Sequence, residues 1–583
     1  MFRTNRYKNY NLNYLQKDMV SGLVVGIVAI PLAMAFAIAS GVRPEYGLYT
    51  SIIAGVIVSL LGGSRFQIAG PTGAFVPVLL GIVMQFGYEK LLIAGFMAGI
   101  MILLMGVFKL GRFIKFIPRP VMIGFTAGIA VIIFSGQIAN FLGLSNLEKE
   151  EAFLLNMREI LLNLNTVNGY SVLVAAISLA IVILTPKYLP KIPGALLGLL
   201  VSTLVAAFFF PNQVETIGSA YGEIPRELPS FVFPEITVSL VIELLPAALV
   251  IAMLGGIESL LSAMVADGMT KTKHESNKEL IGQGIANMVT PLFGGIPATG
   301  AIARTATNIK NGAVSPISGV IHGLVVLLVL VILAPYASAI PLASMAPILM
   351  FVAWNMSERK EFAHIFKTKT MDSLVLIVTF SLTVLIDLTT GVGVGLLLAV
   401  LAFVIRMSST FKISMVLPDP ADKLVKPEMV QKGSNCPQIK IYTVEGPLFF
   451  GSTERFEKEI EKIIRSKPKV LLLRMGNVSF IDTSGEALLT SIVKEFKDKN
   501  QKVIISGAKQ QPKEFFENTG FHQMLGKENF FSKTGDAINH ALMELDVDRC
   551  IGCKQFAFAE CAALSQKSQK TAKIKRKQEL GLT

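Results

Sequence analysis

The sequence is poor in charge and in the residues that catalysis or disulfide bonding would require. Only 16% of its 583 residues are charged, and it contains four cysteines and five histidines. All four cysteines follow residue 435, which excludes the disulfide framework of a small secreted domain. The histidines are scattered, with no Ser-His-Asp order, no metal-ligand spacing and no Gly-rich phosphate loop after a strand. We therefore expect neither an enzyme nor a bound metal or other cofactor.

Hydrophobic residues dominate instead. They account for 52% of the chain and give a mean hydropathy of +0.58, which is typical of a polytopic membrane protein. The basic residues behind the net charge of +13 lie between apolar segments and in a basic tail, so no nucleic-acid partner is expected. The apolar run after residues 1–17 has no small-residue cleavage site, which predicts a first transmembrane helix and not a signal peptide.

The distribution of charge divides the chain into an N-terminus at 1–17, a transmembrane domain at 18–412, a linker at 413–436, a soluble domain at 437–547 and a Cys-containing basic tail at 548–583. Several apolar segments of the transmembrane domain are shorter than the ~20 residues of a straight span. About fourteen such segments lie near 18–40, 47–62, 71–87, 90–108, 120–142, 170–185, 193–210, 238–265, 277–293, 298–311, 314–334, 340–355, 372–388 and 391–410.

Basic and acidic loops fall on opposite sides of the membrane in a count of fourteen spans. The basic side holds Lys109, Arg112, Lys115, Arg119, Lys187, Lys191, Lys271, Lys273, Lys278, Arg359, Lys360, Lys367 and Lys369. The acidic side holds Glu148, Glu150, Glu151, Glu215, Glu223, Glu227 and Glu235. The positive-inside rule then places both termini and the soluble domain in the cytoplasm, as in a bacterial inner-membrane protein.

Two short stretches look like copies of each other. Gly70–Phe75 reads GPTGAF and Ile296–Ile302 reads IPATGAI. Each combines a hydroxyl and small residues with a Pro, which the first turn of a helix tolerates, so each predicts a half-helix that begins inside the membrane. A helix start carries free N–H groups and roughly half a positive charge. Two starts aimed at one point therefore predict an anion site.

The two motifs also suggest an internal repeat. Thr72 and Thr299 lie 227 positions apart, and the same offset relates Pro31 to Glu258. Gly55 and Gly282 are related in the same way. Seven segments per half is an odd number, so the halves are expected to have opposite orientations, with the site at the midplane between them.

Two ionisable residues stand out near these motifs. Glu258 lies in the middle of an apolar segment, where a carboxyl is costly and usually functional, and we expect it to carry a proton. The alternative is a packing role beside Ser259 or Ser262. Arg304 lies one to two turns past the second helix start, and we expect it to attract the anion. Its alternatives are a structural ion pair or a side chain that extends to the cytoplasm.

The stretches Gly26–Ala33, Gly41–Tyr49, Gly62–Phe75 and Gly294–Asn308 resemble the sulfate permease family of anion transporters and exchangers. The resemblance covers nearly the whole chain. It implies an α-helical membrane protein with fourteen transmembrane segments, arranged as two inverted repeats of seven and divided into core and gate domains. It also implies a homodimer in which the core moves like an elevator.

The resemblance implies particular site residues. One wall of the anion site would be formed by Thr72, Gly73, Ala74 and Phe75, and the rest by Phe36, Gly300, Ala301, Ile302 and Arg304. Phe36 and Phe75 could instead belong simply to the core. In relatives, Glu at the position of Glu258 accompanies proton coupling, and Asp accompanies sodium-coupled bicarbonate uptake. Leu32 replaces a Gln that many relatives carry, which removes a polar contact expected of a sulfate pocket.

The C-terminal part alternates short strands with amphipathic helices, which predicts an α/β layer fold. We expect strands at 438–444, 470–475 and 503–506, and helices at 454–465 and 486–498.

Within this part, Val478–Gly485 resembles the signature of STAS domains, named for sulfate transporters and anti-sigma-factor antagonists. In the antagonists the residue after the Asp is phosphorylated, and here it is Thr483. We favour Asp482 and Thr483 as a helix cap; regulation by a cytoplasmic partner is the alternative.

The tail contains Cys550, Cys553 and Cys561, with His540 upstream. The Cys550-x-x-Cys553 pair could bind zinc or form a redox pair, but one pair without a second favours free cytoplasmic thiols. Lys567–Lys577 is a basic segment that anionic membrane lipid could attract.

Taken together, the residues and the resemblance predict a secondary active anion importer, with protons driving symport of sulfate or a related oxyanion or carboxylate. The alternatives within transport are dicarboxylate or bicarbonate uptake by the same mechanism, and an uncoupled exchanger or channel. A membrane-anchored signalling scaffold built on the STAS motif is the alternative from another class.

Overall fold

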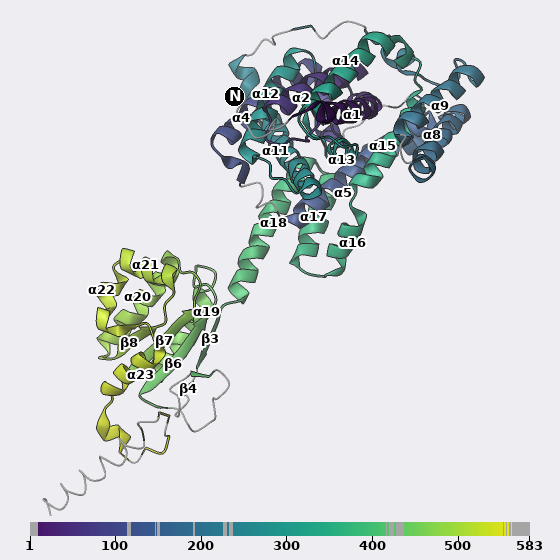
Figure 1. Cartoon of the computed structure of the whole chain (residues 1–583). Helices are drawn as coiled ribbons and strands as arrows, with labels where there is room; N and C mark the ends of the chain where they lie inside the picture. The colour runs from purple at the N-terminus through teal and green to yellow at the C-terminus, as the bar shows by residue number, and fades with distance from the viewer. Residues whose placement is uncertain are drawn as a thin grey trace, which may run out of the picture. The chain divides into compact units, whose positions relative to one another are not determined.

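The computed structural model describes residues 10–112, 118–145, 147, 152–189, 193–225, 230–231, 237–415, 417–418, 425–426, 436–551, 553–555, 557–558 and 561. They form two compact units, Met1–Ala399 and Val400–Thr583, and the boundary falls inside helix α18 (Figure 1). Some expected features lie outside the described residues, namely Lys115, Glu148, Glu150, Glu151, Lys191, Glu227, Glu235, most of the linker and the basic segment at 567–577.

The first unit is built from helices. They are α1 (Leu12–Ala39), α2 (Pro44–Leu61), α3 (Val76–Phe86), α4 (Tyr88–Val107), α5 (Arg119–Gly136), α6 (Ile138–Leu142), α7 (Phe153–Leu162), α8 (Gly169–Tyr188), α9 (Gly194–Phe209), α10 (Ile217–Tyr221), α11 (Val238–Thr270), α12 (Ser276–Leu292), α13 (Ile302–Lys310), α14 (Ile317–Ala337), α15 (Leu342–Met356), α16 (Arg359–Lys367), α17 (Met371–Leu385) and α18 (Leu388–Ser409).

The helices of the first unit agree with the polytopic membrane fold expected from the sequence. Among the described residues, seven helices are long and apolar enough to cross a membrane. Four shorter apolar helices cover 73–86, 194–209, 317–332 and 371–385. The count of fourteen spans and the inversion of the repeat stay predictions.

The helices related by the offset of 227 residues pack in a reciprocal way. Helix α1 packs on α14 while α11 packs on α4, and α2 packs on α14 while α12 packs on α4. Small residues allow the close approaches, because a Cβ on Gly99 would lie 2.5 Å from the backbone nitrogen of Met288. A Cβ on Gly282 would likewise lie 2.6 Å from the Cα of Gly62. Two copies of one helical unit would pack in this manner.

Each of the two copied motifs forms a short strand followed by a short helix. Strand β1 (Ala69–Gly70) pairs antiparallel with β2 (Thr299–Gly300), with Gly70 opposite Thr299. The turn η2 (Gly73–Phe75) leads into α3, which has 11 residues, and α13 has 9. At ~1.5 Å per residue, each helix spans only about half of the ~30 Å hydrocarbon layer. The structure therefore confirms a short helix after each motif, and their start inside the membrane stays a prediction.

The second unit is an α/β layer around a five-stranded sheet in the order β3-β6-β7-β8-β9, parallel except for β3. Its strands are β3 (Lys412–Met415), β6 (Ile439–Glu445), β7 (Val470–Asn477), β8 (Lys502–Ser506) and β9 (Phe530–Phe531), with β4 (Leu417–Pro418) and β5 (Val425–Lys426) forming a separate pair. Its helices are α19 (Thr453–Arg465), α20 (Thr483–Asp498), α21 (Gln510–Asn518), α22 (Phe521–Leu525) and α23 (Thr534–Met543).

Alternating residues of the central strands face the two helical layers. Leu471 and Leu473 belong to the core shared with α19, α20, α21 and α22, whereas Leu472 and Ile504 pack in a core with α23. The expected strands and helices are confirmed within a few residues. The largest difference is α20, which begins at Thr483 because Asp482 caps it.

Candidate functional site

The paired strands bring the two motif threonines to one carboxylate. The Oε2 atom of Glu258, on α11, accepts hydrogen bonds from the hydroxyls of Thr72 and Thr299, each at 2.9 Å. The two hydroxyl oxygens themselves lie 3.1 Å apart. Both threonines are buried, and Glu258 is partly buried. The site therefore offers hydroxyl donors from both motifs, at present directed to a carboxylate.

Arg304 supplies a buried cation beside the paired strands. Its side chain is only 2% exposed, and its guanidinium donates to the carbonyl oxygen of Pro71 at 3.1 Å and to Ser51 Oγ at 3.4 Å. Within the described part of the chain no carboxylate forms an ion pair with it. The alternative in which Arg304 extends to the cytoplasm is wrong, because the side chain crosses from one motif to the other.

Glycines in the first motif make room for these side chains. A Cβ on Gly70 would lie 2.4 Å from Nη1 of Arg304. A Cβ on Gly73 would meet Phe36 at 3.3 Å, and one on Gly255 would meet the Phe75 ring at the same distance. Phe36 and Phe75 are 5% and 1% exposed, so both line the packed interior around the motifs.

The remaining expected site residues lie in the same region but differ in exposure. Ala74 and Ala301 are buried, and the Ala301 N–H donates to the carbonyl oxygen of Ile68 at 2.8 Å. Gly300 is buried in β2, whereas Ile302 begins α13 with 39% of its surface exposed.

A polar network behind the site was not identified from the sequence. The Glu279 carboxylate accepts hydrogen bonds from the backbone N–H groups of Gly63 and Ser64 at 2.7 and 2.9 Å. It also accepts a hydrogen bond from Gln67 Nε2 at 2.9 Å. Ser259 Oγ accepts a hydrogen bond from the Gly300 N–H at 3.0 Å, and the Ser259 carbonyl oxygen accepts one from Gln67 Nε2 at 3.1 Å. The available signal was a second carboxyl, Glu279, in an apolar segment. The network holds the second motif in position.

The STAS motif of the second unit forms a helix cap. Asp482 Oδ1 accepts the Gly485 N–H at 2.9 Å, and Oδ2 accepts the Phe450 N–H at 3.0 Å. The expected cap at Asp482 is therefore confirmed, and it also ties the loop before α19 to the start of α20. Thr483 follows as the first residue of α20 and is exposed.

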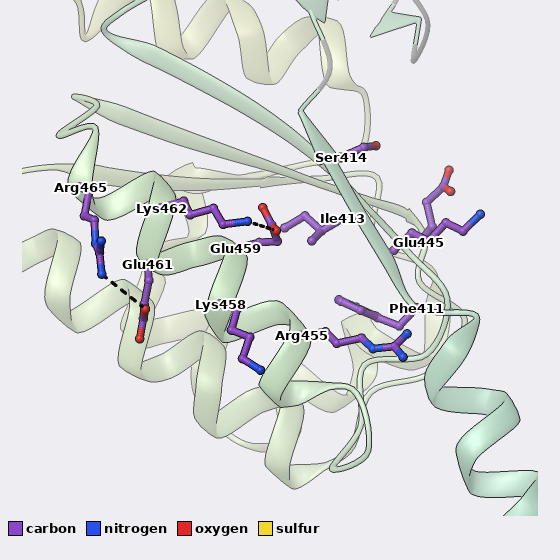
Figure 2. Close-up of a pocket in the computed structure, with 11 residues that line it drawn as sticks. Phe411, Ile413, Ser414, Glu445, Arg455, Lys458, Glu459, Glu461, Lys462 and Arg465 are labelled. Atoms are coloured by element: carbon purple, nitrogen blue, oxygen red, sulfur yellow. Dashed lines mark hydrogen bonds and ion pairs between the residues drawn. The ribbon is translucent and has the colours of Figure 1, made fainter.

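A charged groove lies between β3 and α19 in the second unit (Figure 2). Its charges are largely balanced along the helix, because Lys462 pairs with Glu459 at 2.6 Å and Arg465 lies 4.0 Å from Glu461. These side chains are 38–83% exposed. Such pairs contribute little, and the groove is a solvated face of the domain.

Comparison with protein families matches both units. The sulfate permease family matches residues 15–379, and the STAS domain matches residues 426–537. The YvdB protein of Bacillus subtilis is 60% identical over 91% of this chain and 98% of its own length. Its name describes it, provisionally, as a sulfate transporter. The bicarbonate transporter BicA of Picosynechococcus is 30% identical over 91% of this chain and 95% of its own length.

Solved structures share the same architecture. The murine anion transporter Slc26a9 in its inward-facing state superposes with a TM-score of 0.84 at 18% identity, covering 92% of this chain and 93% of that one. The transmembrane domain of cyanobacterial BicA superposes with a TM-score of 0.60 at 32% identity, covering 66% of this chain and 98% of that domain. The first comparison supports the arrangement of helices followed by a STAS domain.

Proposed function

The chain belongs to the sulfate permease family of anion transporters and is not an enzyme, and from this membership we propose that it is a proton-coupled anion symporter. The proposed substrate is sulfate or a related oxyanion or carboxylate. The observation that carries the proposal is the carboxylate of Glu258 held at 2.9 Å by the hydroxyls of both motifs.

In the proposed cycle, Glu258 and the transported anion compete for the same donors. A carboxylate accepts hydrogen bonds as an oxyanion does, so an ionised Glu258 occupies the hydroxyls of Thr72 and Thr299. Protonation removes that negative charge, and the hydroxyls become free to donate to an incoming anion. The buried Arg304, together with the N–H groups at the starts of α3 and α13, then balances the anion.

Charge balance explains why proton and anion would move together. When Glu258 is ionised, its negative charge offsets the positive charge of Arg304. With Glu258 protonated and no anion bound, the buried Arg304 is left uncompensated, which is costly in a membrane. For a monovalent anion, the empty deprotonated site and the site loaded with both proton and anion are therefore neutral at these two residues. A divalent anion such as sulfate leaves one negative charge when Glu258 is protonated and two when it is ionised, so the proton still lowers the charge that the loaded site carries across the bilayer. An inward proton gradient would drive accumulation of the anion.

The names of the relatives leave the substrate as a choice among small anions. One relative is named provisionally as a sulfate transporter and another as a bicarbonate transporter. Leu32 offers no polar group at a position where many members carry Gln, so carboxylates such as succinate or fumarate belong in the test panel together with sulfate.

Transport by the purified full-length chain in proteoliposomes tests the proposal. Counterflow of sulfate, bicarbonate, succinate, fumarate and chloride identifies the anion that exchanges. We expect an inwardly directed proton gradient to raise its accumulation above equilibrium. Counterflow with no response to the gradient would show an uncoupled exchanger or channel, and no movement of any anion would favour a signalling scaffold.

Assembly and orientation are further parts of the proposal. We propose a homodimer with both termini in the cytoplasm, an elevator-like movement of the core, and a STAS domain open to a cytoplasmic partner. Family membership supports these features. Native mass spectrometry of the detergent-solubilised chain tests the dimer, and labelling of single cysteines placed in the loops of intact cells tests the orientation.

A further inference from the structure

All four cysteines of the chain meet at one cavity in the second unit. The cavity is lined by Cys436, which precedes β6, and by Cys550, Cys553 and Cys561, which follow α23. More than 110 residues separate Cys436 from the other three. The sequence offered one Cys-x-x-Cys pair without a second pair, whereas the fold supplies the missing thiols.

Hydrogen-bond donors point at the sulfur atoms. The backbone N–H groups of Gln438 and Ile439 lie near the Cys436 sulfur. The side-chain amide of Gln438 donates to Cys550 Sγ at 3.5 Å, and the Phe558 N–H donates to Cys561 Sγ at 3.3 Å. Donors of this kind stabilise thiolates and tune the metals that thiolates bind.

The fold holds the two segments together at this point. Gln438 Nε2 donates to the Asp546 carbonyl oxygen, and Gln438 Oε1 accepts the Asp546 N–H, each at 3.0 Å. Cys436, Ala557 and Phe558 are buried in the core that β6, β7 and β8 share with α23. The cysteines therefore belong to a packed part of the domain and not to an open tail.

Charge near the cavity also suits a thiolate site. Arg549 lines the cavity, and Lys440 is close enough to Cys436 to favour its thiolate. A bound metal would take these side chains as thiolates.

We propose that Cys436, Cys550, Cys553 and Cys561 bind a thiophilic metal centre as four thiolates, either Zn²⁺ or an iron–sulfur cluster. Four cysteine ligands with one Cys-x-x-Cys spacing are typical of both. Among the described residues, no three Cys, His, Asp or Glu side chains stand close enough to hold a metal ion as they are. One zinc ion, which needs sulfurs at ~2.3 Å, would therefore draw the side chains inward, whereas a cluster fills a wider gap. In either case the centre would join both ends of the STAS domain.

Metal analysis of the full-length chain tests the proposal. The protein is purified in detergent without oxygen, its affinity tag is removed, and zinc, iron and acid-labile sulfide are measured. We expect about one zinc per chain, or about four iron and four sulfide ions with visible absorbance of a cluster. Less than about a tenth of either, with all four thiols open to a maleimide, would overturn the proposal.

Variants distinguish a built site from contaminating metal. Cys550→Ser and Cys553→Ser should each lose at least half of the bound metal, whereas Lys554→Ser, an exposed change in the same segment, should retain it. Metal content unchanged in the cysteine variants would contradict the proposal. If a cysteine variant fails to fold, the metal content of the unmodified chain still tests the proposal. Chelation without oxygen should expose the four thiols of the unmodified chain. Disulfide-linked peptides recovered from untreated protein that was purified without oxygen would overturn the proposal.

Discussion

The hydroxyl oxygens of Thr72 and Thr299 lie 3.1 Å apart although 227 residues separate them along the chain. This separation is the offset at which the two motifs match in sequence. The two copies therefore meet at their corresponding hydroxyls, through the antiparallel pairing of β1 with β2. Each motif therefore contributes one hydroxyl to the candidate site, and Glu258 and Arg304 both come from the second half of the membrane unit.

Replacing either motif threonine by valine should weaken anion binding. Thr72→Val and Thr299→Val keep the branched shape and remove one donor each. Hydrogen bonds to charged groups contribute about 1.5–3 kcal/mol, so each change should raise the half-saturating anion concentration about tenfold or more. Counterflow measured over a range of anion concentrations gives this value. Thr307→Val is the matched control, because that hydroxyl bonds within α13 to Ala303. Equal half-saturation in all three variants would exclude the hydroxyls from the site.

Removing the buried cation should also weaken anion binding. Arg304→Ala deletes the guanidinium that joins the two motifs, and we expect loss of saturable uptake or a half-saturating concentration raised more than tenfold. Lys310→Ala, at the exposed end of the same helix, should leave transport unchanged. Unchanged affinity in folded Arg304→Ala protein would remove this residue from the site.

A methyl group at Gly300 should disrupt the supporting network. Its Cβ would lie 1.9 Å from Nε2 of Gln67, so Gly300→Ala should destabilise the membrane unit by about 3 kcal/mol. Gly268→Ala, where a Cβ meets nothing within 4 Å, serves as the control. Thermal unfolding in detergent compares the two. In the double variant, Gln67→Ala removes the side chain that the new methyl group would meet, so part of the lost unfolding free energy should be recovered. If the destabilisation of the double variant equals the sum of the two single changes, this explanation is contradicted.

The capping carboxylate of the STAS motif should stabilise the second unit. Asp482→Ala removes the acceptors for Gly485 and Phe450, which should cost about 1 kcal/mol. Hydrogen exchange of the full-length chain should show faster exchange of the Gly485 amide, whereas Thr483→Ala should leave it protected. If Asp482→Ala leaves Gly485 protection intact, the cap does not hold α20.

The sequence predicted the parts of the site that local chemistry specifies. Pro71 and Pro297 marked the two motifs that lead into short helices, although neither proline lies in the first turn of a helix as expected, because β1 and β2 form beside them and the helices begin further on. Glu258 and Arg304 stood out because ionisable groups are rare within apolar segments. The STAS strands were equally visible, since their alternation and turns are local.

Long-range partners could not be predicted. Gln67 reaches Glu279 across 212 residues, and Cys436 lies beside Cys550 only because α23 packs against the central strands. No spacing along the chain encodes such contacts. Span counting met a similar limit. The sequence analysis counted the segment near 298–311 as a span, whereas α13 has only 9 residues and is not among the described helices that are long and apolar enough to cross a membrane.

The central claim is that Glu258 carries the proton that drives uptake. Its most direct test is accumulation of the exchanging anion in proteoliposomes that contain Glu258→Gln, with and without an imposed inward proton gradient. Glutamine keeps the shape of a protonated carboxyl and cannot ionise, so the account predicts counterflow without any response to the gradient. Accumulation by Glu258→Gln that follows the gradient as the unmodified chain does would contradict it.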